Sequence, residues 1–508
     1  MTSSLPAVLR AGSRTVGELL TAQARQSPFS VALIDHDRKL DFKTLNMRVN
    51  RLAHGLTACG VTRGTRIAIL SENRVEYIEA TYAAAKLGAI LAALNWRLAK
   101  DELQHCISLV EPCLMLVSQR FEERLDVCGW AGPTINIDRE YEGLLGKASS
   151  EEPPIVAQPE DGLLILYTSG TTGFPKGALI SHRAELARLD LSRIDVGLAA
   201  GDAFIAWAPM FHMVSLEHAL HTHALGGKVF ILDGPEPKLF VDYIESDPQW
   251  WVVVLPGMID KIIQELKVRK ACPRGVKRVG VLADLLPKKT VAEISALLNA
   301  PYWNSFGSTE TGMVPAAGTV FAPGEEPETL AKAHNSLYVW RLVDDADRDV
   351  APGEPGEIAV RGPTVFSGYW NALETTAKEF RNGYFHMGDM FVELSDGRLN
   401  YVDRAKYLIK SGGENIYPLE IERILMADPS VIEAVVVKKR DDKWGEVPVA
   451  FVVTKEDHVS PEYLIEICRS KLADYKVPRD IRFVNSTDDF PRSTSGKVQR
   501  QRVEAWVK

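Results

Sequence analysis

Cysteine is scarce in this sequence, and its few cysteines form no recognisable pattern. Six cysteines are scattered over 508 residues without a C-x-x-C pair, which fits a reducing compartment and argues against a disulfide framework. Long apolar runs are also absent: no run of apolar residues reaches the length of a membrane-spanning helix. The N-terminal stretch MTSSLPAVLRAGSRTV lacks the continuous apolar core of a signal peptide. We therefore expect a cytoplasmic protein with no membrane span.

An excess of positive charge is missing as well. The formal net charge is −8, whereas a nucleic-acid-binding protein usually presents a basic face, so we expect no nucleic-acid partner. Hydrophobic residues make up 46% and charged residues 25% of the chain, as in ordinary globular proteins. A chain of 508 residues is too long for one small core, which predicts two or more domains.

Strand-like runs alternate with amphipathic, helix-length stretches up to about residue 400. TRIAILS precedes RVEYIEATYAAAKLGAIL, which we interpret as one core helix over 74–91, and WWVVVLP precedes the helical pattern GMIDKIIQELKV. Such alternation predicts mostly parallel sheets covered by helices. Between about 340 and 400, GEIAVRG and GRLNYVD lie among turn residues, which indicates a small antiparallel β part.

The elements become shorter towards the C-terminus. A helix is predicted from Pro418, strands at IEAVVV and PVAFVVT, a second helix with Ser460 as N-cap and Pro461 in its first turn, and a last strand at DIRFV. The predicted fold is a large N-terminal α/β domain of residues 1–403, with mostly parallel sheets, helices and the small antiparallel part. A smaller, mobile α+β domain of residues 404–508 follows it.

The stretch ILYTSGTTGFPKGALISH places a polar, glycine-rich loop between two apolar, strand-like runs. Its glycines let successive backbone N–H groups point into one concavity, and its hydroxyls and one lysine suit a polyphosphate. The pattern is neither a Walker loop nor a dinucleotide fingerprint, and the flanking runs predict a hairpin. The alternative is a flexible surface linker. The candidate phosphate ligands are Thr168, Ser169, Gly170, Thr171, Thr172, Gly173 and Lys176.

The segment YTSGTTGFPKG resembles the signature loop of the adenylate-forming superfamily, which includes acyl-CoA synthetases, adenylation domains and luciferases. Four further segments match in the order of that family: NSFGSTE, YFHMGD, DRAKYLIKSGGENIYP and PRSTSGK. The resemblance covers the chain from about residue 40 to 500. It implies ATP and Mg²⁺ as cofactors and CoA as a co-substrate.

The resemblance implies roles for the segment NSFGSTE. Asn304 would bind the adenine edge, Phe306 would stack on the base, Thr309 would meet a phosphate, and Glu310 would hold Mg²⁺, a cation that prefers oxygen ligands. The family more often has tyrosine at the position of Phe306. The alternative is an ordinary helix N-terminus with Glu310 as an exposed charge.

The same resemblance assigns the ribose and the first half-reaction. Asp389 would accept the ribose hydroxyls, Arg404 would approach ribose and phosphate, and Lys497 would bridge the carboxylate and the α-phosphate as a point charge. The alternatives are that Asp389 only forms a turn and that Lys497 is only solvated.

For thioester formation, the resemblance makes Lys406 a hinge about which the small domain rotates. Lys410, Gly412 and Gly413 would then line a tunnel for the pantetheine thiol, facing WGEVPVAF. A bulky residue at Gly413 is expected to impair this half-reaction. The alternative is a plain glycine turn.

The acid is indicated by APMFHMVSLEH, in which the resemblance places Phe211 and His212 beside the acyl pocket, His212 guiding acyl entry or shaping the pocket. No aspartate occurs between residues 208 and 218 to bind an α-ammonium, and Glu217 is expected to lie outside the pocket. Leu282 and Asp284, bulkier or more charged than usual in the family, would shorten the pocket. We expect a medium-sized aliphatic, cyclic or aromatic acid. A metal site built from the histidines 212, 218, 221 and 223 is the alternative use of this segment.

The sequence therefore predicts an acid–thiol ligase, an acyl-CoA synthetase that acts on a small-molecule carboxylic acid through acyl-AMP. The alternatives are an enzyme that loads a carrier protein and an inactive nucleotide-binding homologue. Intact Lys176, Glu310, Asp389 and Lys497 argue against inactivity. The oligomeric state is left open, with a homodimer as one option.

Overall fold

The computed structural model describes residues 11–168, 174–255, 257–412, 414–455, 459–492 and 497–507. The chain forms two compact units. The first unit comprises residues 1–329, 333–339 and 361–385, and the second unit comprises residues 330–332, 340–360 and 386–508. In the part of the chain that is described, no helix is long and apolar enough to cross a membrane.

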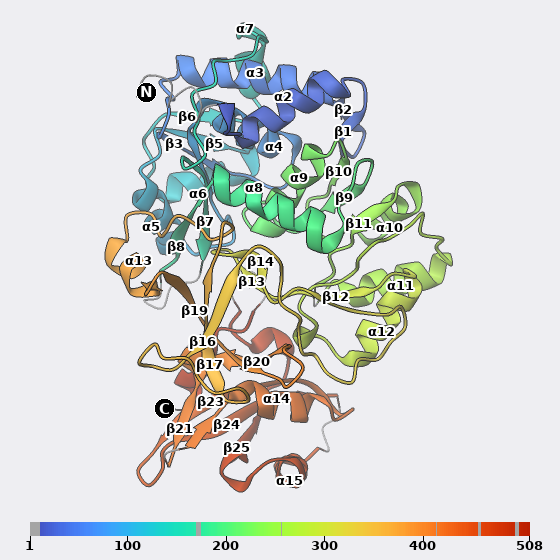
Figure 1. The fold of residues 1–508 in the computed structure, drawn as a ribbon, viewed down its shortest axis with the longest axis vertical. Coiled ribbons are helices and arrows are strands. Elements are labelled where there is room, and N and C mark those ends of the chain that lie inside the picture. The colour runs from blue at the N-terminus through green and yellow to red at the C-terminus, as the bar shows by residue number, and fades with distance from the viewer. Residues whose placement is uncertain are drawn as a thin grey trace. The chain divides into compact units, whose positions relative to one another are not determined.

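Two sheets of mostly parallel strands form the frame of the first unit (Figure 1). The six-stranded sheet has the order β6-β5-β3-β4-β7-β8, and only β8 runs antiparallel to its neighbour. Its strands are β3 (Arg66–Leu70), β4 (Ile90–Ala93), β5 (Leu114–Val117), β6 (Thr134–Asn136), β7 (Gly162–Thr168) and β8 (Lys176–Ser181). The five-stranded sheet has the order β11-β9-β10-β1-β2, with β2 antiparallel. Its strands are β1 (Val31–Asp35), β2 (Arg38–Asp41), β9 (Ala203–Ala206), β10 (Lys228–Ile231) and β11 (Gln249–Trp251).

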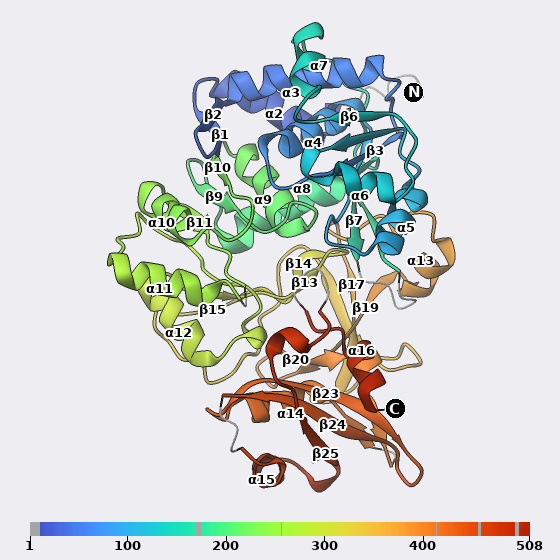
Figure 2. The same ribbon diagram turned by 180° about the vertical axis from the view of Figure 1, so that it is seen from behind.

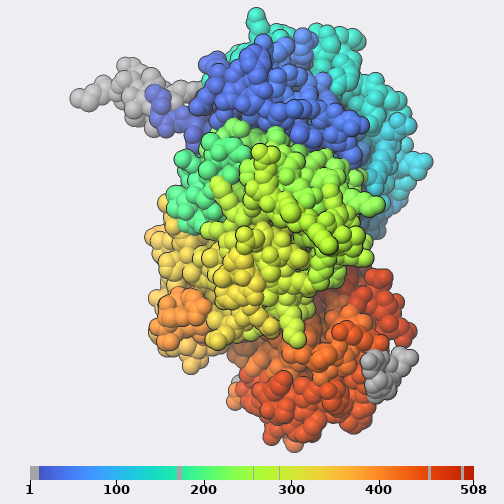
Figure 3. All heavy atoms as spheres, turned by 90° about the vertical axis from the view of Figure 1, so that its right-hand side faces the viewer, coloured from blue at the N-terminus to red at the C-terminus, as the bar shows by residue number. Residues whose placement is uncertain are grey.

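A layer of helices packs between these two sheets. Helix α4 contacts β4 and β7, α9 contacts β9 and β10, and α2 contacts both helices. Accordingly, the blue N-terminal segment and the green segment lie directly against each other in the space-filling view of Figure 3. These layer helices are α2 (Val16–Gln26), α3 (Phe42–Ala58), α4 (Val75–Leu87), α8 (His182–Leu191) and α9 (Met213–Ala224).

Other helices cover the outer faces and the ends of the sheets. Figure 2 shows α10, α11 and α12 as a group, in which α11 contacts both of its neighbours. These helices are α5 (Lys100–Val110), α6 (Glu122–Val127), α7 (Tyr141–Lys147), α10 (Pro237–Ser246), α11 (Ile259–Arg269), α12 (Lys288–Leu297) and α13 (Leu373–Glu379).

The single helix that the sequence predicts over 74–91 is wrong in its last four residues, 88–91. Helix α4 ends at Leu87 because Gly88 adopts a left-handed conformation with φ 63°, which glycine allows at no steric cost. The next apolar residues form β4, an inner strand that is buried along its whole length. A helix that is buried on all sides and a strand that is buried on both faces are equally apolar, so periodicity does not separate them here.

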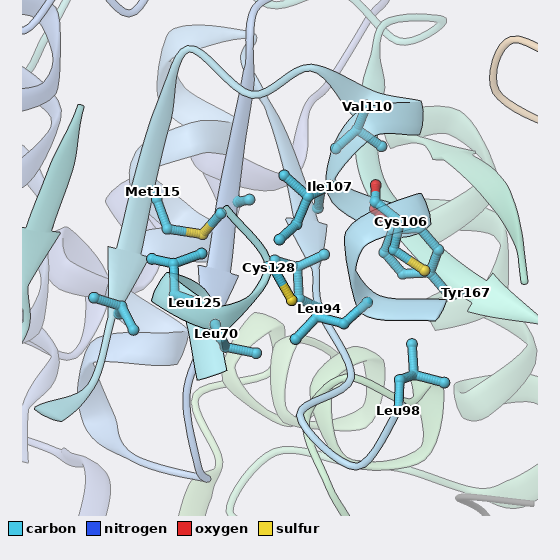
Figure 4. Packing of buried hydrophobic residues seen from close by; sticks show 14 of the residues in the cluster. Leu70, Leu94, Leu98, Cys106, Ile107, Val110, Met115, Leu125, Cys128 and Tyr167 are labelled. Carbon is cyan, nitrogen blue, oxygen red and sulfur yellow. The ribbon is translucent and has the colours of Figure 1, made fainter. Parts of the chain in front are cut away.

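The hydrophobic core of the six-stranded sheet is closed on one face by α5 and α6. Figure 4 shows Cys106, Ile107 and Val110 of α5 against side chains of the strands. Tyr167 of β7 belongs to this cluster, and its hydroxyl donates to the carbonyl of Cys106 at 3.0 Å. A buried hydroxyl needs such a partner to offset its lost hydration.

Smaller antiparallel pairs follow in the sequence. The strands β12 (Tyr302–Asn304) and β15 (Thr319–Phe321) pair with each other, as do β13 (Gly307–Ser308) and β14 (Gly312–Pro315). A further sheet has the order β16-β17-β19-β18, with β20 paired to β19. Its strands are β16 (Val339–Val343), β17 (Pro355–Arg361), β18 (Phe380–Arg381), β19 (Tyr384–Glu393) and β20 (Leu399–Arg404). These strands form the predicted antiparallel β part.

The C-terminal part of the second unit is an α+β fold. Its sheet has the order β22-β21-β24-β23, with β25 paired parallel to β24. One sheet face packs on α14 and α15, and the other packs on Phe490, Val503 and Val507, as the period of two in β23 and β24 requires. The elements are β21 (Ile409–Ser411), β22 (Glu414–Ile416), α14 (Pro418–Met426), β23 (Val431–Asp441), β24 (Gly445–Thr454), α15 (Pro461–Lys471), β25 (Asp480–Phe483) and α16 (Arg500–Glu504). The predicted fold class is thus confirmed, while the predicted boundary at residue 403 stays a prediction.

His182, the first residue of α8, connects the hairpin of β7 and β8 to α2. Its side chain is fully buried, and its Nδ1 accepts a hydrogen bond from the backbone N–H of Val16 at 3.2 Å. Burial lowers the pKa of His182 from its ordinary 6.5 to about 4, although nearby carboxylates such as Asp161 oppose this shift. The unfolded chain therefore binds more protons than the folded chain between these two values.

We expect the free energy of unfolding of the first unit to fall as the pH falls from about 6.5 to about 4. Once the pH is below both pKa values, this shift lowers the free energy of unfolding by about 3 kcal/mol relative to a pH above 6.5. His182→Gln keeps an acceptor for Val16 and should flatten this pH dependence, which urea unfolding followed by tryptophan fluorescence measures. The matched control is His54→Gln, because His54 is less buried. An identical pH slope for wild type and His182→Gln would contradict the assignment.

Candidate active site

The predicted phosphate loop joins the antiparallel strands β7 and β8. Thr168 is the last residue of β7 and pairs with Lys176, the first residue of β8. The hairpin is therefore present, and both residues lie at the end of the hairpin that carries the loop. The predicted ligands Ser169, Gly170, Thr171, Thr172 and Gly173 lie outside the described residues.

The exit of this loop is held by α5. Phe174 is exposed, and its ring lies 4.8 Å from the His105 ring, centroid to centroid. The Nε2 atom of His105 lies 3.2 Å from the carbonyl oxygen of Pro175, so His105 donates there. A ring contact and a hydrogen bond thus fix the residues directly before Lys176.

A second segment runs along the free edge of β8. The backbone N–H of Ser367 donates to Leu179 at 2.8 Å, Leu179 donates to Gly368 at 3.0 Å, and Trp370 donates to Gly177 at 2.8 Å. These bonds continue the sheet beyond β8 and bring Tyr369 beside the end of the hairpin, where it bridges to Ala178. The sequence analysis did not identify this segment.

Lys176 and Glu310 meet on the side chain of Tyr369. The Lys176 ammonium lies 4.5 Å from the centroid of the Tyr369 ring and 3.9 Å from Oε1 of Glu379 in α13. The Tyr369 hydroxyl donates to Oε1 of Glu310 at 2.9 Å. The structure thereby brings together two predicted site residues that are far apart in the sequence.

Glu310 lies in the tight turn between β13 and β14, after Thr309. The alternative of a helix N-terminus for this segment is wrong, because residues 307–315 form a short antiparallel hairpin. Thr309 and Glu310 are half-buried, and the carbonyl of Glu310 accepts from the N–H of Phe366 at 2.8 Å. The backbone of the turn is therefore fixed, while the side chains of Thr309 and Glu310 stay partly accessible to solvent.

The two predicted adenine ligands are more buried. Asn304 ends β12, is fully buried, and accepts a hydrogen bond on its Oδ1 from the N–H of Ala283 at 3.1 Å. This bond orients the amide so that Nδ2 faces away from Ala283. Phe306 retains only 7% exposure.

Arg188 of α8 connects three segments of the site and was not identified from the sequence. Its guanidinium donates to the carbonyl of Thr309 at 3.0 Å, to the carbonyl of Thr364 at 3.1 Å and to the carboxylate of Glu217 in α9 at 2.5 Å. Both charged side chains are almost fully buried. The two additional hydrogen bonds to backbone carbonyls help to offset the cost of removing the charged pair from water.

Glu217 is therefore engaged by Arg188, and its place outside the acyl pocket stays a prediction. Burial raises the pKa of its carboxyl, and the Arg188 charge opposes this shift. His212 directly precedes α9, and its ring lies 4.6 Å from that of Phe211. Their place at the entrance of the acyl pocket stays a prediction.

The histidines of α9 point to separate partners. Nδ1 of His218 lies 2.7 Å from the Val214 carbonyl, His221 lies 3.1 Å from Glu185, and Nε2 of His223 lies 3.0 Å from the Ala32 carbonyl. Among the described residues, no group of three or more His, Cys, Asp or Glu side chains is arranged to hold a metal ion. The metal alternative for these histidines has no support there.

The second unit brings together Asp389, Arg404 and Lys497. Asp389 of β19 is buried and pairs across the strands with Arg404 of β20, with 2.9 Å between Oδ1 and Nε. The residue Lys497 as a whole is exposed, but burial of its ammonium group among its neighbours lowers the pKa of Lys497. The Arg404 charge lowers that pKa further, and the Asp389 charge opposes both effects.

The segment around Lys497 is held on both sides. Arg492 donates to the carboxylate of Glu433 in β23 at 2.5 Å and forms a β-bridge with Val498. Arg500 donates to the Val436 carbonyl at 2.8 Å and pairs with the buried Glu422 at 2.5 Å. Lys497 is thus attached to β23 and α14 within three residues along the chain.

The predicted CoA segment is partly described. Lys410 is exposed, and its N–H donates to Glu446 at 2.9 Å. Gly412 has a φ of 59° and donates to the Trp444 carbonyl at 2.7 Å, and a Cβ atom there would lie 2.7 Å from the Trp444 ring. Position 412 therefore requires glycine. Gly413 lies outside the described residues.

Comparison with known proteins gives matches over nearly the whole chain. Residues 20–370 match the model of AMP-binding enzymes, and residues 420–497 match that of the AMP-binding enzyme C-terminal domain. The chain is 33% identical to an indoleacetate–CoA ligase of Aromatoleum aromaticum, over 97% of this chain and 98% of the relative. It is 32% identical to a feruloyl-CoA synthase of Amycolatopsis sp., over 96% and 98%.

A solved structure has the same fold. It is the o-succinylbenzoate coenzyme A synthetase of Bacillus subtilis in complex with ATP and magnesium ion, with 27% identity and a TM-score of 0.84 over 96% of this chain and 99% of that chain. The resemblance seen in the motifs is thus confirmed. The chain belongs to the AMP-binding enzyme family within the adenylate-forming superfamily, and it is an acid–thiol ligase.

Proposed function

We propose that this ligase activates an aromatic carboxylic acid without an α-amino group, first as acyl-AMP and then as acyl-CoA. The names of the compared relatives support an aromatic acid, since they act on indoleacetate, ferulate and o-succinylbenzoate. The engagement of Glu217 by Arg188 supports the lack of an α-amine, because a carboxylate already paired in this way is a poor partner for a substrate ammonium.

The observation that carries the proposal is the convergence of Lys176 and Glu310 on Tyr369. A triphosphate needs a cation near its terminal phosphates and a magnesium ion shared between protein and phosphate oxygens. Mg²⁺ typically binds through one or two carboxylates together with substrate phosphates. The half-buried Glu310, outside any cluster of three ligating side chains among the described residues, fits that kind of site. Mg²⁺ bound there would neutralise phosphate charge.

We assign the remaining nucleotide contacts as the family resemblance implies. Thr168 and the loop 169–173 hold the phosphates, Thr309 adds a hydroxyl, and Asn304 and Phe306 bind adenine. Asp389 and Arg404 bind the ribose and its phosphate.

In the first half-reaction, a carboxylate oxygen of the acid attacks the α-phosphorus. The bond from that phosphorus to the bridging oxygen breaks, and pyrophosphate leaves. An anion approaches a polyanion, so a fixed cation at the new bond lowers the barrier. Lys497 supplies this cation, and the phosphate charge favours its protonated form against the neighbouring Arg404.

In the second half-reaction, the thiol sulfur of CoA attacks the acyl carbonyl carbon and AMP leaves. We propose that the C-terminal domain turns about Lys406, which withdraws Lys497 and presents Lys410, Gly412 and Gly413 to the pantetheine arm. The backbone of Gly412 lies against Trp444 without an intervening side chain, as a narrow passage requires.

The acyl pocket is proposed to begin at His212 and Phe211 and to be shortened by Leu282 and Asp284. Because Leu282 and Asp284 would shorten the pocket, we expect a compact ring to fit better than a long straight chain. A cytoplasmic location and a homodimer stay predictions.

A panel of acids tests the proposal. We expect pyrophosphate release with aryl acids such as indoleacetate and 3-phenylpropionate, and acyl-CoA formation when CoA is added. Phenylalanine differs from 3-phenylpropionate only in its α-ammonium, whose burial without a partner should lower kcat/KM by about 100-fold or more. Palmitate should be a poor substrate. No release with any acid would indicate an inactive homologue, and release that loads a carrier protein but not CoA would indicate a different acceptor.

Lys497→Ala tests the division of labour between the half-reactions. Acyl-AMP formation should slow by about 10²–10³, the usual cost of removing one preorganised charge partner. Thioester formation from preformed acyl-AMP should remain close to wild type. Both rates are measured by single-turnover quench, with the exposed Lys471→Ala of α15 as the matched control. An equal loss in both steps would refute the role of Lys497.

A further inference from the structure

We propose that Tyr369 is a positioning residue for the nucleotide, with its hydroxyl orienting Glu310 and its ring seating the ammonium of Lys176. This inference rests on the proposed function, in which those two residues hold Mg²⁺ and phosphate. It assigns a role to a side chain that lies in none of the motifs that indicate the family.

The hydroxyl contact fixes the metal-binding carboxylate. The Tyr369 hydroxyl lies 2.9 Å from Oε1 of Glu310, and a hydrogen bond to an ionised acceptor is stronger than one between neutral groups. A carboxylate offers about four acceptor positions, so one bond from Tyr369 selects a rotamer of Glu310 and leaves acceptor capacity for a cation. Without it, Glu310 would have to be ordered by the metal itself.

The ring contact fixes the phosphate-binding ammonium. Nζ of Lys176 lies 4.5 Å from the ring centroid of Tyr369, within the range of a cation–π interaction. A lysine side chain loses up to about 2 kcal/mol of rotamer entropy when it is held in place. Because the ring already holds the lysine side chain, this entropy is lost before a nucleotide binds. The Glu379 carboxylate, 3.9 Å from the ammonium, holds it from another side.

Tyr369 can position both groups because it is itself rigid. Only 8% of the residue is exposed, and its N–H donates to Thr376 Oγ1 of α13 at 2.9 Å. Its ring packs against Phe366, with 4.9 Å between the centroids, and Phe366 also donates its N–H to the carbonyl of Glu310. The segment therefore holds the backbone and the side chain of Glu310 at the same time.

Two substitutions separate the two contacts. Tyr369→Phe keeps the ring under Lys176 and removes the hydroxyl from Glu310, whereas Tyr369→Leu removes both. Tyr243 provides a matched control, because it is also 8% exposed but packs against Phe230 away from these residues. The corresponding variants are Tyr243→Phe and Tyr243→Leu.

Binding of ATP is measured by calorimetry, in EDTA and over a Mg²⁺ titration, so that the readout is independent of turnover. Tyr369→Phe should bind ATP in EDTA like wild type but need about 10-fold more Mg²⁺, as loss of a hydrogen bond to a charged group implies. Tyr369→Leu should show the same Mg²⁺ defect and also bind ATP in EDTA about 3- to 10-fold more weakly. The Tyr243 variants should match wild type in both.

The outcomes separate the inference from the function on which it rests. Wild-type Mg²⁺ dependence in Tyr369→Phe, or equal defects in the leucine variants of Tyr369 and Tyr243, would overturn the inference. Lys176→Met and Glu310→Gln are measured alongside. If these two variants bind ATP and Mg²⁺ normally, the proposed function fails and the inference fails with it. If Tyr369→Leu does not fold, as shown by circular dichroism, the phenylalanine variant still decides the hydroxyl contact.

Discussion

The site depends on the position of β8 between two partners. On one edge β8 pairs with β7 and closes the hairpin, and on its other edge it pairs with the segment of residues 367–370. The first pairing fixes where the loop starts and ends. The second brings a distant part of the chain to the same place, and with it Tyr369. Backbone hydrogen bonds, which are insensitive to side-chain identity, thus determine which side chains can meet.

The charged groups of the site are held before any ligand binds. Arg188 and Glu217 form a buried pair that also supports the backbone of Thr309, and Asp389 and Arg404 pair across neighbouring strands. Such pairs cost desolvation energy and add little net stability. In the proposed function, charges that are already oriented in this way need no reorganisation when the reaction proceeds.

The sequence indicated the fold class and the ends of the phosphate hairpin, because alternating patterns and glycine-rich turns are local signals. The resemblance to the adenylate-forming superfamily also predicted Asp389 and Arg404, which the structure pairs across neighbouring strands. The sequence did not indicate Tyr369 or Arg188, whose partners lie 59 and 121 residues away. Their significance arises only from tertiary contacts, which periodicity does not encode. The error at 74–91 has a local cause, since one glycine separates a buried helix from a buried strand of equal hydrophobicity.

The anchoring of Lys497 has a consequence for the timing of the reaction. The bridge between Arg492 and Val498 and the pair between Arg500 and Glu422 hold the backbone around Lys497. In the proposed domain rotation, Lys497 would therefore leave together with the sheet and helices to which it is attached. Collective displacements of this size occur in microseconds to milliseconds. One rotation of the C-terminal domain would then separate adenylation from thiol transfer in time.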